Sequence, residues 1–164
     1  MTCIECGSQM RSTRENRRYD AGGLPQVILL GLEVRRCPKC GVEEIVIPQI
    51  EQLHRVIAEA LIRKLTRLDG SEIRYLRKYL GWSGADFARH LGTARETVSR
   101  WEKGVQPIGP QADRLLRLSV ATTVPVKDYS TADLTRIDSR GSKPVPAQLS
   151  LKASRNRWAL KNAA

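Results

Sequence analysis

The chain has 164 residues, a formal net charge of +11 and only 5% aromatic residues. That length suits one domain or two small ones, and the composition excludes a large hydrophobic core. No apolar run approaches the roughly 20 residues of a membrane span, and the first residues lack the pattern of a secretory signal. We therefore expect a cytoplasmic protein with no membrane partner. The positive charge indicates an anionic partner, and nucleic acid is the first candidate. A basic face that only contacts solvent is the alternative explanation of the charge.

Residues 1–47, the first predicted unit, contain all four cysteines in two C-x-x-C-G motifs. Two residues between cysteines let both thiolates reach one metal ion from a tight turn, and the following glycine permits a positive φ. Two such turns supply four sulfur ligands, which fill a tetrahedral site and leave no position for a catalytic water. The sequence therefore predicts one structural Zn²⁺ per chain, with the ligands Cys3, Cys6, Cys37 and Cys40.

Two other uses of these cysteines stay open, a redox or disulfide role and an iron–sulfur centre. Reduced thiols in the cytoplasm favour the metal. Between the motifs we expect a polar loop over residues 12–23 and short strands over 24–35, followed by another strand over 42–47. Structural Zn²⁺ binds small zinc fingers with an apparent free energy of about 10–16 kcal/mol. We therefore expect the metal to dominate the stability of this unit.

A connecting amphipathic helix is predicted over residues 48–68, with a proline in its first turn. Its apolar residues recur at helical spacing: Ile50, Leu53, Val56, Ile57, Ala60, Leu61, Leu65 and Leu68. We expect this stripe to lie in a core, either within the monomer or between two copies.

Three short helices are expected at the start of a third unit, residues 69–122. Each opens on two polar residues spaced as in a capping box: Asp69 with Glu72, Ser83 with Asp86, and Thr93 with Glu96. Each ends at a glycine, namely Gly81, Gly92 or Gly104. The turn between the second and third helices is short and contains glycine, as a helix-turn-helix requires.

The third of these helices is predicted to bury Val98 and Trp101 and to turn its polar face towards DNA. Arg100 can make a bidentate contact to guanine. Arg95 lies near the start of the helix, where a recognition helix usually contacts the edges of the bases. Glu96 either accepts a hydrogen bond from the N4 amino group of cytosine or caps the helix. The full set of predicted DNA-binding residues is Ser83, Arg95, Glu96, Thr97, Ser99, Arg100 and Lys103. A helical bundle with ordinary solvated arginines is the alternative.

These segments carry a family resemblance. IRYLR and LGWS within residues 73–83, HLGT at 90–93 and TVSRWEKG at 97–104 resemble the Xre/Cro/phage-repressor helix-turn-helix. The two C-x-x-C-G motifs ahead of it resemble the YgiT-type zinc domain. Together, over roughly residues 1–120, they resemble the MqsA family of type II antitoxins. The resemblance implies a mainly α fold, with a small N-terminal β-containing zinc domain and a helical Xre/Cro-like domain in the second half.

The same resemblance implies partners and one internal contact. The helix-turn-helix domain of a homodimer would bind a palindromic operator in double-stranded DNA. The zinc domain would bind a toxin, an mRNA interferase, and the chain would repress its own operon. An ion pair between Arg77 and Glu102 is implied inside the DNA-binding domain.

Residues 123–164 are expected to form a flexible basic tail, because proline, serine and glycine become frequent there. Within it, residues 151–160 are interpreted as a basic arm that contacts DNA, as a short docking helix, or as disordered.

Two other functions compete with the antitoxin. One is a stand-alone zinc-containing Xre-type regulator with no toxin partner. The other is an enzyme or an RNA-handling zinc protein. The sequence has no paired carboxylates in a suitable context, no nucleophile–histidine arrangement and no phosphate-cradling glycine loop. We therefore expect no enzymatic activity.

Overall fold

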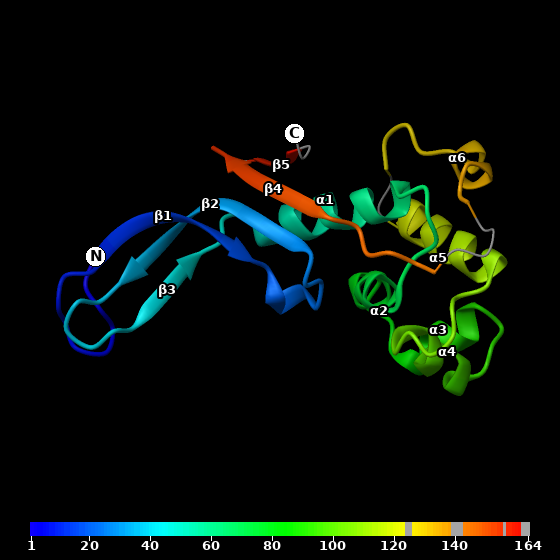
Figure 1. Ribbon diagram of the computed structural model, residues 1–164, viewed down its shortest axis with the longest axis horizontal. Helices are drawn as coiled ribbons and strands as arrows, with labels where there is room; N and C mark the ends of the chain where they lie inside the picture. Colours follow the sequence, from blue (N-terminus) through cyan, green and yellow to red (C-terminus); the bar gives the residue numbers. More distant parts are fainter. Residues whose placement is uncertain (124–125, 139–142, 156, 162–164) are drawn as a thin grey trace.

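The computed structural model describes residues 1–123, 126–138, 143–155 and 157–161. A strand-containing region precedes a helical region, as the sequence predicts. The molecule is elongated, with a β-ribbon at one end and a cluster of helices at the other (Figure 1). None of the helices in the described ranges combines the length and the apolarity that a membrane crossing needs.

The N-terminal region is a β-ribbon of three strands, β1 (Arg11–Arg18), β2 (Val27–Arg36) and β3 (Glu43–Val46). β1 and β2 are antiparallel and are joined through a short 3-10 helix, Asp20–Gly22. β3 pairs with the second half of β2, so that Glu43 lies opposite Arg36. The turns before β1 and between β2 and β3 therefore meet at the free end of the ribbon (Figure 1).

β1 corrects one expectation, because most of the polar loop predicted over residues 12–23 is strand. Little of β1 is buried, so its sequence shows no apolar alternation to reveal a strand. Ion pairs across the ribbon hold it instead. Glu15 pairs with Arg36, and Glu43 pairs with both Arg36, at 2.7 Å, and Arg17, at 2.9 Å. A register irregularity lies between Glu15 and Arg17.

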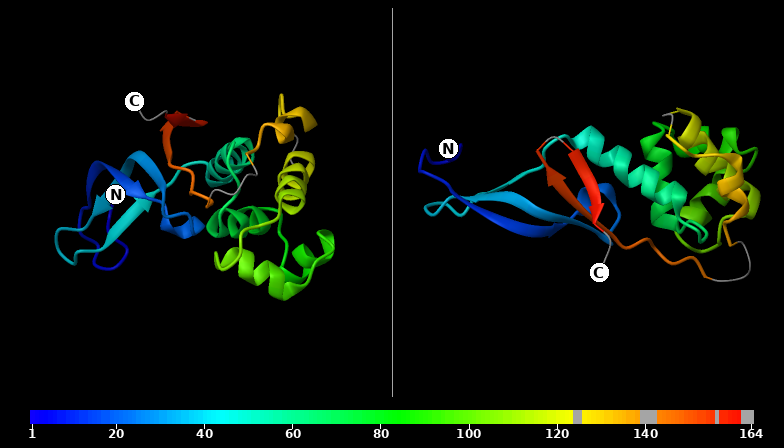
Figure 2. Two further views of the ribbon diagram at one scale, coloured as in Figure 1. Left: turned by 45° about the vertical axis from the view of Figure 1, so that its right-hand side comes forward. Right: turned by 90° about the horizontal axis from the view of Figure 1, so that it is seen from above.

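The structure also differs from the flexible tail expected over residues 123–164. This range contains a helix, α6 (Thr131–Thr135), and two strands, β4 (Leu149–Ser154) and β5 (Arg157–Lys161). β4 pairs in parallel with the first half of β2, and β5 pairs antiparallel with β4 (Figure 2). Residues 124–125, 139–142, 156 and 162–164 of the expected tail lie outside the described residues.

Burial explains why these two strands dock on the sheet. Leu151 of β4 and Trp158 of β5 are buried in the main core. The Trp158 indole Nε1 donates to the main-chain oxygen of Pro48 at 2.7 Å, and its main-chain N–H donates to Gln52 Oε1. Burying one tryptophan and one leucine gives these strands the apolar contact that a lone hairpin lacks.

The helical region begins with α1 (Ile50–Arg63), which is shorter than the helix predicted over residues 48–68. Part of its predicted stripe packs within the monomer, where Leu53, Ile57 and Leu61 are buried, whereas Ile50 and Leu65 are 42% and 52% exposed. The other helices are α2 (Gly70–Tyr79), α3 (Gly84–His90), α4 (Arg95–Glu102) and α5 (Pro110–Thr123). One continuous core cluster includes residues of the sheet, of α1 and of α2–α5, so the two regions share their apolar interior.

Candidate metal centre and nucleic-acid interface

The four cysteines lie in two turns at the free end of the ribbon. Cys3 and Cys6 precede β1, and Cys37 and Cys40 lie between β2 and β3. In each turn the glycine after the second cysteine has a positive φ, 70° at Gly7 and 76° at Gly41, and its N–H donates to the oxygen of the first cysteine. The glycines thus close both turns as the sequence predicts.

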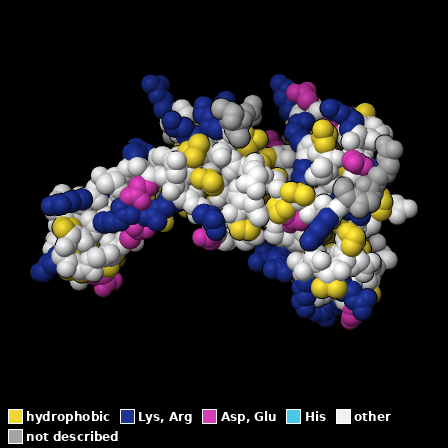
Figure 3. Space-filling view, viewed as in Figure 1, with side chains coloured by type: hydrophobic (Ala, Val, Ile, Leu, Met, Phe, Trp, Pro, Cys, Tyr) yellow, Lys and Arg dark blue, Asp and Glu magenta, His cyan; other side chains and the backbone are white. Residues whose placement is uncertain are grey.

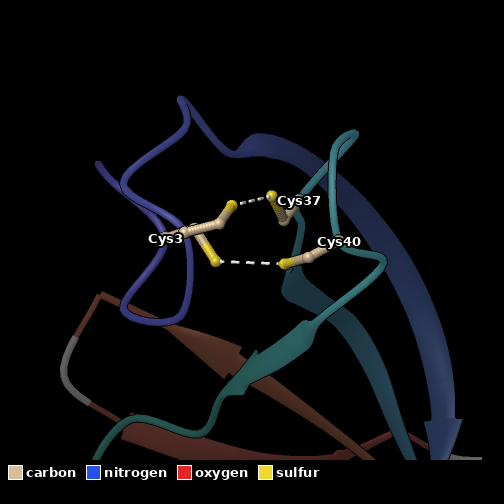
Figure 4. A group of neighbouring side chains, drawn as sticks. Cys3, Cys37 and Cys40 are labelled. Atoms are coloured by element: carbon tan, nitrogen blue, oxygen red, sulfur yellow. Dashed lines mark hydrogen bonds between the residues drawn. The ribbon is translucent and has the colours of Figure 1, made fainter.

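The four sulfur atoms converge on one point between the turns (Figure 4). All of them lie within 4.8 Å of one another, with 3.5 Å between the sulfurs of Cys3 and Cys40 and 3.4 Å between those of Cys6 and Cys37. A tetrahedral ion with metal–sulfur bonds of about 2.3 Å requires sulfur separations of about 3.8 Å. The four cysteines are therefore positioned to hold one metal ion.

The surroundings of these sulfurs suit metal binding. The main-chain N–H of Cys40 hydrogen-bonds the Cys37 sulfur and lowers the pKa of that thiol to about 6, whereas the neighbouring thiols of Cys3 and Cys37 outweigh the Val42 N–H and raise the pKa of the Cys40 thiol. Binding of a metal ion by all four sulfurs therefore releases protons from this cluster. The apolar core here is small. Cys3, Cys37 and Met10 are buried together, with Cys6 and Val42 packed against them. So small a core has little stability of its own, and a metal ion bound by the four sulfurs would add to it.

At the other end of the molecule, α3 and α4 are joined by a short turn that contains Gly92, with φ 60°. Ser83 caps α3 and forms the predicted capping box with Asp86, and Asp69 and Glu72 do the same for α2. The capping box predicted from Thr93 and Glu96 is wrong. α4 starts after Ala94, which offers no side-chain cap, so Thr93 lies one residue too early to serve.

The inner face of α4 packs as the sequence predicts. Val98 and Trp101 are buried, and the Trp101 ring meets the Phe87 ring of α3 edge-on, with centroids 6.4 Å apart. Ala88 of α3 is also buried and leaves room for the two helices to approach closely. This packing determines which side chains of α4 face outwards.

The outer face of α4 carries the residues predicted to bind DNA. Arg95, Glu96, Arg100 and Lys103 are exposed, whereas Thr97 and Ser99 are half-buried. Most of them line a shallow depression of about 640 Å³, whose walls are Arg95, Glu96, Ser99, Arg100, Lys103 and Val105. Lys and Arg side chains gather on the outer edge of the lobe that contains α3 and α4 (Figure 3). Thr97 does not line the depression.

Ser83 lies apart from this group. It is exposed at the start of α3, where its Oγ both accepts from the Asp86 N–H and donates to Asp86 Oδ2 at 2.6 Å. Sequence reasoning missed Val105, which lines the depression with 73% of its side chain exposed. The only signal in the sequence was an apolar residue directly after the glycine that ends α4.

An ion pair links α2 to the end of α4. Arg77 Nε lies 2.5 Å from Glu102 Oε1, and Arg77 Nη2 lies 3.1 Å from Glu102 Oε2. Arg77 Nη1 also donates to the Trp82 main-chain oxygen at 2.8 Å. Arg74 adds a weaker contact to the same carboxylate at 3.4 Å. This pair was implied by the family resemblance, and its geometry is bidentate.

Comparisons with known proteins bear on the helical region. A helix-turn-helix family model matches residues 73–128, which cover most of α2 and all of α3, α4 and α5. No curated protein and no solved structure matches the chain. Residues 73–128 therefore form an Xre-type helix-turn-helix domain, the DNA-binding fold of transcription regulators, on a chain whose four N-terminal cysteines are positioned to hold one metal ion.

Proposed function

We propose that this protein is a zinc-containing, sequence-specific DNA-binding antitoxin that represses its own operon and neutralises a toxin through its N-terminal region. The observation that carries the DNA-binding part is the two-sided character of α4. Its inner face is anchored by Val98 and Trp101, and its outer face presents Arg95, Glu96 and Arg100 to solvent. A regulator built in this way needs no catalytic group.

In this proposal α4 enters the major groove. Arg100 makes a bidentate contact to a guanine, and Arg95 contacts a base edge near the helix start. Since the N-cap position of α4 is Ala94, Glu96 does not serve in a capping box and is available to accept from cytosine N4. Thr97, Ser99 and Lys103 complete the contacts on α4, and Ser83 lies at the start of α3, near the backbone.

The proposed operator is palindromic because the proposed regulator is a homodimer. Two copies related by a two-fold axis place their α4 helices in successive major grooves, about 34–36 Å apart. The large positive charge of the chain adds sequence-independent attraction to the phosphates, which weakens as salt rises.

Zinc is the proposed metal, as a structural ion. Four cysteine thiolates form a complete tetrahedral donor set for Zn²⁺, and no protein position remains open for a reacting water. In the cytoplasm, the proposed location, thiols stay reduced and available to the metal. Redox and iron–sulfur uses of the same cysteines are the competing interpretations.

The toxin partner is proposed for the ribbon. The free end of the ribbon lies far from α4 (Figure 1), so a protein bound there does not obstruct DNA. Exposed apolar side chains lie near this end, with Ile4 86% and Ile45 45% exposed. Single exposed apolar side chains are ordinary on protein surfaces, so the family resemblance, and not this exposure, is what supports a toxin at the ribbon. The family resemblance suggests an mRNA interferase as the bound toxin.

Titration of the full chain with a labelled fragment of its own promoter tests the DNA-binding part. We expect saturable binding that is at least about a thousandfold tighter than binding to a scrambled duplex at physiological salt. Equal affinity for both duplexes, erased by moderate salt, would overturn the proposal.

Co-expression with the neighbouring small reading frame tests the toxin part. We expect a stable complex with this chain and growth arrest when the neighbour is expressed alone. A harmless neighbour that does not co-purify would instead support the alternative, a stand-alone zinc-containing Xre-type regulator. Such a regulator would still bind its operator, so the two experiments separate the two parts of the proposal.

A further inference from the structure

The hairpin of β4 and β5 has two faces of opposite character. On its inner face, Leu151 and Trp158 are buried in the main core. Directly opposed residues of an antiparallel pair lie on the same face of a sheet. The outer face therefore consists of three pairs that each join a small residue to a basic one: Ser150 with Lys161, Ala159 with Lys152, and Ser154 with Arg157. All of these residues are exposed except Ser150, which is half-buried.

The basic side chains of the hairpin have no carboxylate to neutralise them. No acidic residue follows Asp138 in the sequence, whereas six basic residues do. Four of the six are exposed on the hairpin, and none of these four forms an ion pair with a described residue. We call them the hairpin cations: Lys152, Arg155, Arg157 and Lys161. The arginines of the ribbon differ, since Arg17 and Arg36 both pair with a glutamate.

The hairpin lies on the opposite side of the molecule from the recognition helix. In Figure 1 β4 and β5 are at the top of the molecule and α4 is at the bottom, and the left view of Figure 2 agrees. Lys and Arg side chains also stand out at the top of the space-filling view (Figure 3). A straight duplex that contacts α4 does not reach that side, so an anion that meets the hairpin cations binds at a separate surface.

The composition of the outer face favours a nucleic-acid backbone over other large anions. Serine hydroxyls beside lysine and arginine are the groups that contact phosphate and sugar in protein–DNA complexes. Protein–protein interfaces are depleted of lysine and enriched in aromatic anchors, but the aromatic residue of the hairpin, Trp158, is buried. For the same reason the face has no ring on which the bases of a single strand could stack. Double-stranded DNA, with its high density of phosphates, fits best.

We propose that the outer face of the β4–β5 hairpin is a second DNA-binding surface, which contacts the phosphates of a duplex without regard to sequence. Arg157 and Lys161 are four residues apart on β5, or about 13 Å at the rise of a strand, so they meet different phosphates. Lys152 lies between them on the neighbouring strand, opposite Ala159. Such a surface would let one molecule hold two duplex segments. That consequence rests on the proposed function, whereas binding at the hairpin does not.

Binding of a duplex of random sequence tests the hairpin separately from α4. The reference protein is the full chain without the basic side chains of α4, that is, with Arg95→Ala, Arg100→Ala and Lys103→Ala. We expect this protein still to bind a random duplex at low salt, as measured by fluorescence anisotropy. The hairpin variant adds three further substitutions, Lys152→Gln, Arg157→Gln and Lys161→Gln. It should bind at least about tenfold more weakly, and the slope of log affinity against log salt concentration should fall by about 2–3.

A control variant loses the same charge elsewhere in the reference protein, through Arg11→Gln, Lys39→Gln and Lys127→Gln, three exposed positions outside the hairpin. Because distant charges are screened by salt, we expect it to bind less than about threefold more weakly. The hairpin variant should remain folded, since its three substituted side chains are exposed. The indole N–H signal of Trp158 in a nuclear magnetic resonance spectrum checks this, because that group donates to Pro48 only while the hairpin is docked.

Equal losses in the hairpin and control variants would show that only the total charge matters and would overturn the proposal. Absence of duplex binding in the reference protein would overturn it too. Tighter binding of a single-stranded oligonucleotide, or of vesicles that contain phosphatidylserine, would assign the face to another partner. If the cations only keep the open edge of β5 from pairing with other strands, the hairpin variant will aggregate but bind the duplex like the reference protein. The duplex is random and α4 is altered throughout, so the result is independent of operator recognition.

Discussion

Arg117 and Asp113 form a buried ion pair one turn apart on α5, with Arg117 Nε 2.5 Å from Asp113 Oδ1. Their side chains are 0% and 2% exposed. The other guanidinium nitrogens donate to three main-chain oxygens, that of Ile62 in the last turn of α1 and those of Lys64 and Thr66 between α1 and α2. Asp113 Oδ2 accepts from the Leu68 N–H. The pair thus holds the link between the two helices in one conformation.

We expect Arg117→Met to lower the free energy of unfolding by about 3–5 kcal/mol, because it leaves a buried carboxylate and three carbonyls without their donor. Urea denaturation followed by circular dichroism measures the change. Gln111→Met on the exposed face of the same helix is the control and should stay within about 0.5 kcal/mol. A loss below about 1 kcal/mol for Arg117→Met would show that the link is held by other contacts.

Glu102→Ala tests the pair between α2 and α4. Arg77 and Glu102 are only 13% and 11% exposed, so removing the carboxylate should cost about 3 kcal/mol in urea denaturation. Arg74, 47% exposed and 3.4 Å from the same carboxylate, should contribute far less. We therefore expect Arg74→Ala to cost less than about 1 kcal/mol. Similar losses for both variants would contradict this ranking.

Cys37→Ser should lower the bound metal below one ion per chain and loosen the free end of the ribbon. The reason is that the small core around Cys3 and Met10 has little apolar area of its own. Metal analysis and limited proteolysis of the full chain measure the two effects. Lys39→Ala lies in the same turn, keeps all four sulfurs and should change neither. Full metal content in Cys37→Ser would refute the four-cysteine centre.

Arg100→Ala should weaken binding to the operator by about 1–3 kcal/mol and relax the preference at one base pair. The fold should be unaffected, since this side chain is exposed. Fluorescence anisotropy with the operator and with single-base variants measures both effects. Arg18→Ala on β1 removes the same charge outside the helix-turn-helix domain and is the matched control. Identical operator affinities for the two variants would place the specific contact elsewhere.

His54 should make the stability fall as the solution is acidified. It lies half-buried beside Tyr19, whose hydroxyl is 2.6 Å from His54 Nε2, and burial lowers its pKa below the ordinary 6.5. The unfolded chain therefore takes up the proton first, so stability is lost as pH falls below about 6.5. Urea denaturation at several pH values between 7 and 5 should show that the free energy of unfolding changes less with pH in His54→Gln than in the parent. An equal pH dependence in the two proteins would show that His54 does not cause the loss of stability. His90→Gln is the control for the other histidine.

Local signals in the sequence predicted much of the fold. The two capping boxes at Asp69 and Ser83 and the glycines at 81, 92 and 104 act within a few residues, so they are visible without tertiary structure. The two cysteine turns are local as well, but they meet only because β1 and β3 pair with β2. Thr93 shows the limit of such reasoning, because Thr93–Glu96 has the spacing of a capping box but the helix starts one residue later.

Features that depend on distant contacts were not predictable in this way. β1 has no apolar face, and its ion pairs reach from Glu15 to Arg36 and from Arg17 to Glu43. β4 and β5 lie in a region rich in proline and serine. They are strands because β4 pairs with β2, β5 pairs with β4, and Trp158 is buried.

The parallel pairing of β4 with β2 has a consequence for synthesis on the ribosome. Val27 is made long before its neighbour Leu149, with the entire helix-turn-helix domain translated in between. Throughout that interval the first half of β2 presents an open edge to other nascent chains. A truncated product that stops before β4 would keep its recognition helix, but the edge of β2 would stay unpaired. We therefore expect premature termination to yield aggregates.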